Sequence, residues 1–214
     1  LLKIQKKYNF YLIGGDLSKS SKLSISSTFI GTSKNNIVSN QNKISINNDI
    51  WITGNLGESY IGLQILKNKI KLNNKKIKKY FIKKYYYPKP CLLGSKITRY
   101  TKSVKDVSDG FIGDLKKMLN NNYGAKINLN DIPFSNNVKN LLLNNHIHLH
   151  NLLNCGDDYE LILVSENKFR KKIVDISKKN KVKITRVGVV TKNKIISDDS
   201  NNSINLPKKF DHFR

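Results

Sequence analysis

The sequence has few of the residues that cross-link a protein or anchor it in a membrane. Its two cysteines, Cys91 and Cys155, form no CxxC pair, which argues against a disulfide framework or a zinc knuckle. No apolar run approaches the roughly 18 to 20 residues needed to cross a bilayer, and the first ten residues show no signal-peptide pattern. We therefore expect a soluble, cytoplasmic protein of one or two globular domains, with no membrane partner.

Acidic residues are also scarce: the chain has 15 of them against 39 basic residues, a net charge of +24. Such an excess can indicate a nucleic-acid partner. However, only 4 of the basic residues are Arg, while Asn reaches 29 and Ala only 1, a profile typical of an A+T-rich genome. Phosphate binding favours Arg, whose planar fork meets two phosphate oxygens. We expect a solvated lysine surface and no specific nucleic-acid binding, with a basic nucleic-acid-binding protein as an alternative.

Several common catalytic motifs are absent. There is no GxxxxGK[ST], no GxGxxG after a strand and no GxSxG, which excludes a Walker-type site, a dinucleotide fold and a serine-hydrolase elbow. His146, His148 and His150 could share one face of a strand as metal ligands, but their stretch is rich in Asn and has no carboxylate nearby, which favours surface polar residues. For Cys155 an inert buried thiol is favoured over a nucleophile.

Hydrophobic periodicity predicts alternating strands and helices without a strict βαβ rhythm, which favours an α+β fold. Residues 35–48 are polar and suit a crossing between two domains, 1–34 and 35–214. The first residues are typical of the end of a helix, so an upstream half is expected to be missing. Strands are predicted at 8–13, 23–29, 50–53, 104–107, 125–129, 159–164, 182–190 and 194–196. Helices are predicted at 75–86, 136–144 and 168–179. A further helix is predicted after the turn at 54–59, with Ile61, Ile65 and Leu66 on one face. Another is predicted after 108–110, and its inward face is formed by Phe111, Ile112, Leu115, Met118 and Leu119.

The placement of the few carboxylates carries information. Seven of the 15 fall in four short segments marked by Gly or an aromatic residue: Asp16; Asp106 and Asp109; Asp157, Asp158 and Glu160; and Asp211. A carboxylate in a loop at the end of a strand can hold Mg²⁺ together with substrate phosphates. It can equally cap a following helix or close an Asx-turn, and for Asp109, which precedes Gly110 and a helix, both interpretations stay open.

Taken in order, the motifs resemble one family. They are GGDLSKS (14–20), IWITGNLGES (50–59), PKP (88–90), DVSDG (106–110), GAKINL (124–129), IPFS (132–135), GDDYEL (156–161) and FDHF (210–213), and together they resemble the thiamine-monophosphate kinases. The resemblance implies ATP-dependent phosphorylation of thiamine monophosphate to thiamine diphosphate by direct, Mg²⁺-assisted transfer. It also implies a two-domain fold like that of aminoimidazole-ribonucleotide synthetase, in which the N-terminal domain pairs in a homodimer and the C-terminal α+β domain is complete here.

The resemblance also implies site residues. Matches to the family's ATP contacts are Gly15, Asp16 and Ser108. Matches to its Mg²⁺ ligands are Asp16, Asp106 and Asp109. Matches to its substrate contacts are Asp157, where Glu is usual, and Phe210.

Departures from the family pattern are equally specific. Gln41, Lys19 and Cys91 stand where the family usually has Arg, and Gln41 would remove a charge from ATP binding. The family's upstream Asp-rich metal motifs and substrate-contacting His would precede Leu1, so the chain is expected to be roughly the C-terminal two thirds of the enzyme and inactive alone. Another ATP-using synthetase of the same superfamily, acting on a purine-pathway amide or selenide, is an alternative.

Overall fold

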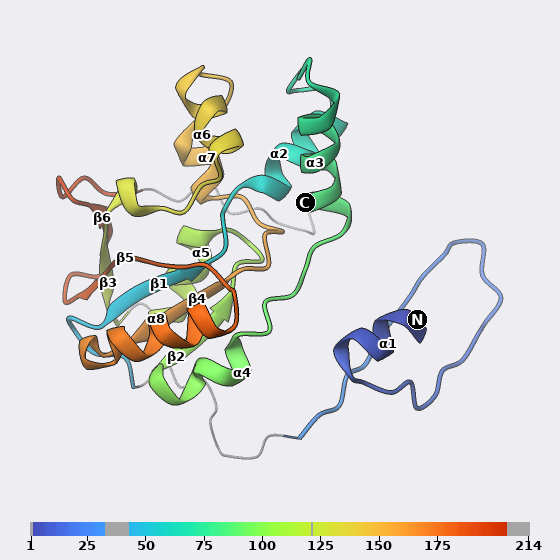
Figure 1. Ribbon diagram of the computed structural model, residues 1–214, viewed down its shortest axis with the longest axis horizontal. Helices are drawn as coiled ribbons and strands as arrows, with labels where there is room; N and C mark the ends of the chain where they lie inside the picture. Colours follow the sequence, from blue (N-terminus) through green and yellow to red (C-terminus); the bar gives the residue numbers. More distant parts are fainter. Residues whose placement is uncertain (1, 33–42, 121, 205–214) are drawn as a thin grey trace. The chain divides into compact units, whose positions relative to one another are not determined.

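A computed structural model describes residues 2–32, 43–120 and 122–204 (Figure 1). The chain divides into two compact units, residues 1–36 and 37–214. The first unit begins with helix α1 (Leu2–Tyr8), which agrees with the predicted helix end, and α1 buries none of its residues. No other helix or strand occurs among the described residues of this unit.

The two strands predicted at 8–13 and 23–29 are therefore wrong. Their alternating apolar side chains are exposed, as at Tyr11 (82%), Ile13 (87%) and Ile25 (80%). A strand is held by hydrogen bonds to a neighbouring strand, and apolar alternation alone does not supply that neighbour. Within the described part of the chain, every strand belongs to the second unit.

The second unit is built on one six-stranded sheet in the order β2-β4-β1-β5-β3-β6. All neighbouring pairs are antiparallel except β3 and β6, which are parallel. Strand β1 lies inside the sheet and all five of its residues are buried. The strands are β1 (Asp49–Thr53), β2 (Ser103–Asp106), β3 (Gly124–Ile127), β4 (Leu161–Ser165), β5 (Ile184–Thr191) and β6 (Ile196–Asp198).

Helices cover both faces of this sheet. Successive side chains of a strand point to opposite faces, so Ile50 and Ile52 enter the larger core with Phe111, while Trp51 packs with Ile173 in a smaller cluster. In Figure 1, α5 lies behind the sheet and α8 in front of it. The helices of this unit are α2 (Glu58–Leu66), α3 (Lys75–Tyr86), α4 (Gly94–Ile97), α5 (Phe111–Met118), α6 (Asn136–Leu143), α7 (Leu149–Leu153) and α8 (Arg170–Lys179). Short 3₁₀ turns occupy Thr98–Tyr100, Leu129–Asp131 and Asn167–Phe169.

Most predicted elements of this unit are confirmed, and the α+β fold with them. Helix α3 has the predicted bounds, with Asn74 capping it through bonds from the backbone N–H groups of Lys76 and Ile77. Strand β4 starts at Leu161, later than predicted, because Tyr159 has a positive φ that an extended strand does not allow. Leu66, predicted on the buried face of α2, is 36% exposed, and α4 and α7 were not predicted. None of the helices in the described ranges is both long enough and apolar enough to cross a membrane.

Candidate active site

The loop between β2 and α5 carries three of the predicted site residues. Asp106 ends β2, and Ser108 and Asp109 follow before Gly110, whose φ of 118° favours glycine. The backbone N–H groups of Ser108 and Asp109 both donate to one carboxylate oxygen, Oδ2 of Asp114, at 3.0 and 2.8 Å. Asp114 lies in the first turn of α5 and is fully buried, so this helix holds the loop that precedes it.

A second loop, between α7 and β4, lies directly against the first. The N–H of Asp157 donates to the carbonyl of Ser108 (3.1 Å), and that of Tyr159 to the carbonyl of Val107 (3.0 Å). Gly156 permits this approach, because a Cβ at that position would lie 1.9 Å from the Ser108 carbonyl oxygen. Residues about fifty positions apart in the sequence are thereby joined, and Asp157 is brought to the same edge of the sheet as the first loop.

Carboxylates from both loops lie close enough to the Tyr159 phenol to affect its pKa. Tyr159 donates its hydroxyl to Asp157 Oδ1 (3.4 Å). Burial raises the pKa of Tyr159, and the negative charges of Asp157, Asp106 and Asp109 raise it further. Three carboxylates predicted to bind metal or substrate therefore act on one phenol.

Lys117 of α5 forms an ion pair with Asp109, which raises the pKa of the lysine, and also lies 3.5 Å from Asp114 Oδ1.

No group of three or more His, Cys, Asp or Glu that could hold a metal occurs within the described ranges. Asp106 and Asp109 still fit Mg²⁺ chemically, because Mg²⁺ usually takes one or two carboxylates and completes its shell with water and substrate phosphates.

At the end of the second loop, Asp158 and Glu160 are half-buried, and each accepts a hydrogen bond from another segment. Asp158 accepts hydrogen bonds from the N–H groups of Gly57 (2.6 Å) and Ser59 (3.3 Å) at the start of α2. Burial outweighs these two bonds and raises the pKa of Asp158 to about 7. Glu160 accepts from the Thr53 hydroxyl (2.6 Å), and burial raises its pKa as well. Both acids were singled out in the sequence, but their structural roles were not.

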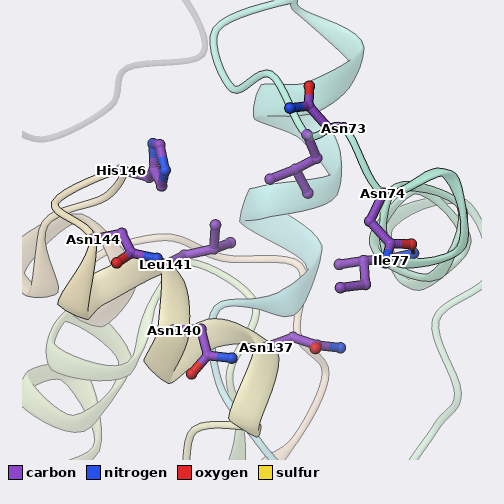
Figure 2. A pocket seen from close by; sticks show the side chains of 9 residues that line it. Asn73, Asn74, Ile77, Asn137, Asn140, Leu141, Asn144 and His146 are labelled. Atoms are coloured by element: carbon purple, nitrogen blue, oxygen red, sulfur yellow. Dashed lines mark hydrogen bonds between the residues drawn. The ribbon is translucent and has the colours of Figure 1, made fainter.

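Asp158 and Glu160 both line a pocket of about 230 Å³, and Tyr87 and Lys89 also contribute to its wall. Glu58 lies on its wall and is 2% exposed; it accepts from the Tyr80 hydroxyl and pairs with Lys84, each at 2.6 Å. A second pocket, of about 210 Å³, lies between α6 and the start of α3 (Figure 2). Asparagine side chains dominate its lining, from Asn73, Asn74, Asn137, Asn140 and Asn144, together with His146.

The remaining predicted residues do not belong to these two loops. Gly15 and Asp16 are exposed in the first unit, outside any helix or strand, and Ser18 donates to Asp16 at 3.4 Å. Phe210, Asp211 and Gln41 lie outside the described residues. The histidine stretch is not a strand: it comprises a turn and α7, and His146, His148 and His150 are all exposed.

Cys155 and Asp114 also lie near these loops. Burial raises the pKa of the Cys155 thiol well above its ordinary value, which disfavours the thiolate form that a nucleophile needs. Asp114 was missed entirely. The available signal was an acidic residue at an otherwise apolar position of the predicted helix that follows Gly110, since buried carboxylates in a helix need partners.

The chain is similar to known proteins in both sequence and structure. No family model matches the chain. A curated protein named thiamine-monophosphate kinase from Buchnera aphidicola subsp. Acyrthosiphon pisum is 37% identical over 99% of this chain and 66% of the relative. Its namesake from Buchnera aphidicola subsp. Schizaphis graminum is 40% identical over 88% of the chain and 58% of the relative. The chain thus spans two thirds or less of the length of these relatives.

Solved structures share the fold. Thiamine-monophosphate kinase from Stenotrophomonas maltophilia superposes with a TM-score of 0.67 at 21% identity, over 77% of this chain and 53% of that one. A structure described as AaThiL complexed with AMPPCP and TMP gives 0.61 at 19% identity, over 78% and 50%. HypE from E. coli gives 0.64 at 13% identity, over 82% and 54%. The matched part of the chain therefore has the synthetase-like α+β fold that the resemblance implied.

Proposed function

Because this chain belongs to the thiamine-monophosphate kinase family, we propose that the protein containing it transfers the γ-phosphoryl group of ATP to thiamine monophosphate, giving thiamine diphosphate and ADP. The observation that carries the proposal is the 37% identity over 99% of the chain with a kinase of that name. The structure described as a complex with AMPPCP and TMP, on the same fold, supports ATP and thiamine monophosphate as the two substrates.

In this proposal the edge formed by the two joined loops faces the phosphates. Asp106 and Asp109 would bind Mg²⁺, and Ser108 would contact ATP. Asp157, fastened to Ser108 by a 3.1 Å backbone hydrogen bond, would contact thiamine monophosphate. That bond fixes the distance between a nucleotide contact and an acceptor contact, which is the positioning that phosphoryl transfer requires.

The reaction needs no covalent enzyme intermediate and no side-chain base. An oxygen of the thiamine phosphate attacks the γ-phosphorus, the bond to the β–γ bridging oxygen breaks, and ADP leaves. Since the acceptor phosphate is already ionised, there is no proton to remove. Mg²⁺, when bound, neutralises the gathered phosphate oxygens, while the carboxylates of this chain hold it.

Further parts of the proposal concern residues whose place in the site is not described. Gly15 and Asp16 of residues 1–34 would complete ATP and Mg²⁺ binding, and Phe210 would pack against thiamine. Residues 1–34 would belong to a dimer-forming domain and residues 35–214 to the C-terminal domain. We also propose a homodimer that works in the cytoplasm.

Other functions considered for the sequence have less support. Another synthetase of the superfamily would be expected to share sequence and not only fold, yet HypE is 13% identical. Nucleic-acid binding rests on net charge alone. A nucleic-acid-binding function would require that the protein binds duplexes with a sequence preference at physiological salt. If binding showed no preference and weakened steeply as the salt concentration rose, it would indicate only a lysine surface.

The test is a product assay on the protein that contains this chain, with ATP, Mg²⁺ and thiamine monophosphate. We expect thiamine diphosphate and ADP in equal amounts, and none when Mg²⁺ is chelated. The matched control replaces Asp106 by Asn, which preserves size while removing the charge that holds the metal. Failure of the unmodified protein to make thiamine diphosphate would refute the proposed function.

A further inference from the structure

Asp114 differs from the other acids near the candidate site because it lies underneath the loop and not at its surface. It is 0% exposed. Its Oδ2 accepts both the Ser108 and the Asp109 N–H groups, at 3.0 and 2.8 Å. These are adjacent backbone donors, so one oxygen fixes two consecutive peptide groups of the proposed nucleotide and metal loop.

The other carboxylate oxygen of Asp114 faces lysines. Oδ1 has no hydrogen-bond partner among the described residues and lies 3.7 Å from Lys105 Nζ and 3.5 Å from Lys117 Nζ. Lys117 also pairs with Asp109. A buried carboxylate needs compensating charge, and here that charge is shared with a proposed metal ligand. The position of Asp109 is thus tied to Asp114 through both its backbone and its side-chain partner.

We propose that Asp114 is a positioning residue, which holds the peptide groups of Ser108 and Asp109 in the conformation that presents the Asp109 carboxylate to Mg²⁺ and Ser108 to the nucleotide. This inference rests on the proposed function for what the loop binds, and on the structure alone for how the loop is held. Residues that orient metal ligands without touching the metal commonly change affinity by 10- to 100-fold when lost.

Two substitutions separate the hydrogen bonds from the charge. Asp114→Ala removes the acceptor, whereas Asp114→Asn keeps an oxygen that can accept both N–H groups. Asp49→Asn is the matched control, because Asp49 is also 0% exposed and pairs with Arg170 and Arg186 in the same sheet unit, away from this loop. It reports what the loss of a buried charge does to stability alone.

Two measurements on the full-length protein test the proposal. The first is hydrogen exchange of the Ser108 and Asp109 amides without ligand. We expect protection in the unmodified protein and in Asp114→Asn, and fast exchange in Asp114→Ala. The second is calorimetric titration with AMPPCP at increasing Mg²⁺. We expect the Mg²⁺ concentration for half-maximal binding to rise about 10- to 100-fold in Asp114→Ala, and to change less in Asp114→Asn and Asp49→Asn.

Wild-type amide protection and Mg²⁺ dependence in a folded Asp114→Ala protein would overturn the proposal, as would an equal Mg²⁺ shift in Asp49→Asn. If Asp114→Ala does not fold, the unmodified protein decides, since unprotected Ser108 and Asp109 amides would contradict the geometry. If the protein binds AMPPCP and Mg²⁺ as expected but makes no thiamine diphosphate, the proposed function fails while the positioning role stands.

Discussion

Asp158 makes the stability of this protein depend on pH in a way that one substitution should remove. Its carboxylate is buried against the start of α2, where Gly57 N–H donates at 2.6 Å. The folded protein raises its pKa from 3.8 to about 7. The folded state therefore keeps a proton that the unfolded chain has already released over this pH range. The contribution of Asp158 to the stability is therefore greatest below pH 4 and falls as the pH rises toward 7.

The size of this effect follows from the shift. One pKa unit corresponds to about 1.4 kcal/mol, so the full shift corresponds to roughly 4 kcal/mol, of which about 3 kcal/mol falls between pH 5 and pH 8. Asp158→Asn is neutral throughout and keeps an oxygen for the Gly57 N–H. It loses only the weaker bond from Ser59, which is 3.3 Å long.

The assay is urea unfolding, followed by circular dichroism, of both proteins at pH 5 and pH 8. Other groups titrate in this range as well, including Glu160, whose raised pKa has the same sign. The informative quantity is therefore the difference between the two proteins at each pH. We expect Asp158→Asn to gain about 3 kcal/mol relative to the unmodified protein on going from pH 5 to pH 8. Parallel pH profiles for the two proteins would refute the reasoning.

Four other substitutions test the site and its support. Asp106→Asn or Asp109→Asn should lower turnover by orders of magnitude, because each removes a proposed Mg²⁺ ligand. The urea midpoint should change little, since both carboxylates are at the surface. Near-normal turnover at limiting Mg²⁺ would favour a helix-capping role for Asp109. Gly156→Ala should destabilise by about 3 kcal/mol in thermal unfolding, because its Cβ would lie 1.9 Å from a carbonyl oxygen of the facing loop. Thr53→Val should cost about 2 kcal/mol, because the hydroxyl donates to Glu160 at 2.6 Å and accepts from the Leu161 N–H at 2.8 Å. An unchanged urea midpoint would contradict these two bonds.

The sequence by itself determined the elements whose signals are local. The apolar spacing in α5 placed Phe111 and Leu115 in the core, and both are fully buried. The bounds of α3 were also predicted, because Pro88 and Pro90 stop a helix locally, whereas the cap at Asn74 was seen only in the structure. The ordered motifs also identified the family, since matches spread along the chain are more specific than any one of them.

Features that depend on residues far apart in the sequence became visible only in the folded chain. The apolar alternation around Ile25 predicted a strand, yet a strand needs a neighbour that no local pattern supplies. The junction of Gly156 with Ser108 and the placement of Asp158 at the start of α2 are contacts between segments far apart in sequence. Asp114 was hidden for the same reason. A single acidic residue in a helix acquires its meaning from the backbone groups and lysines that folding brings around it.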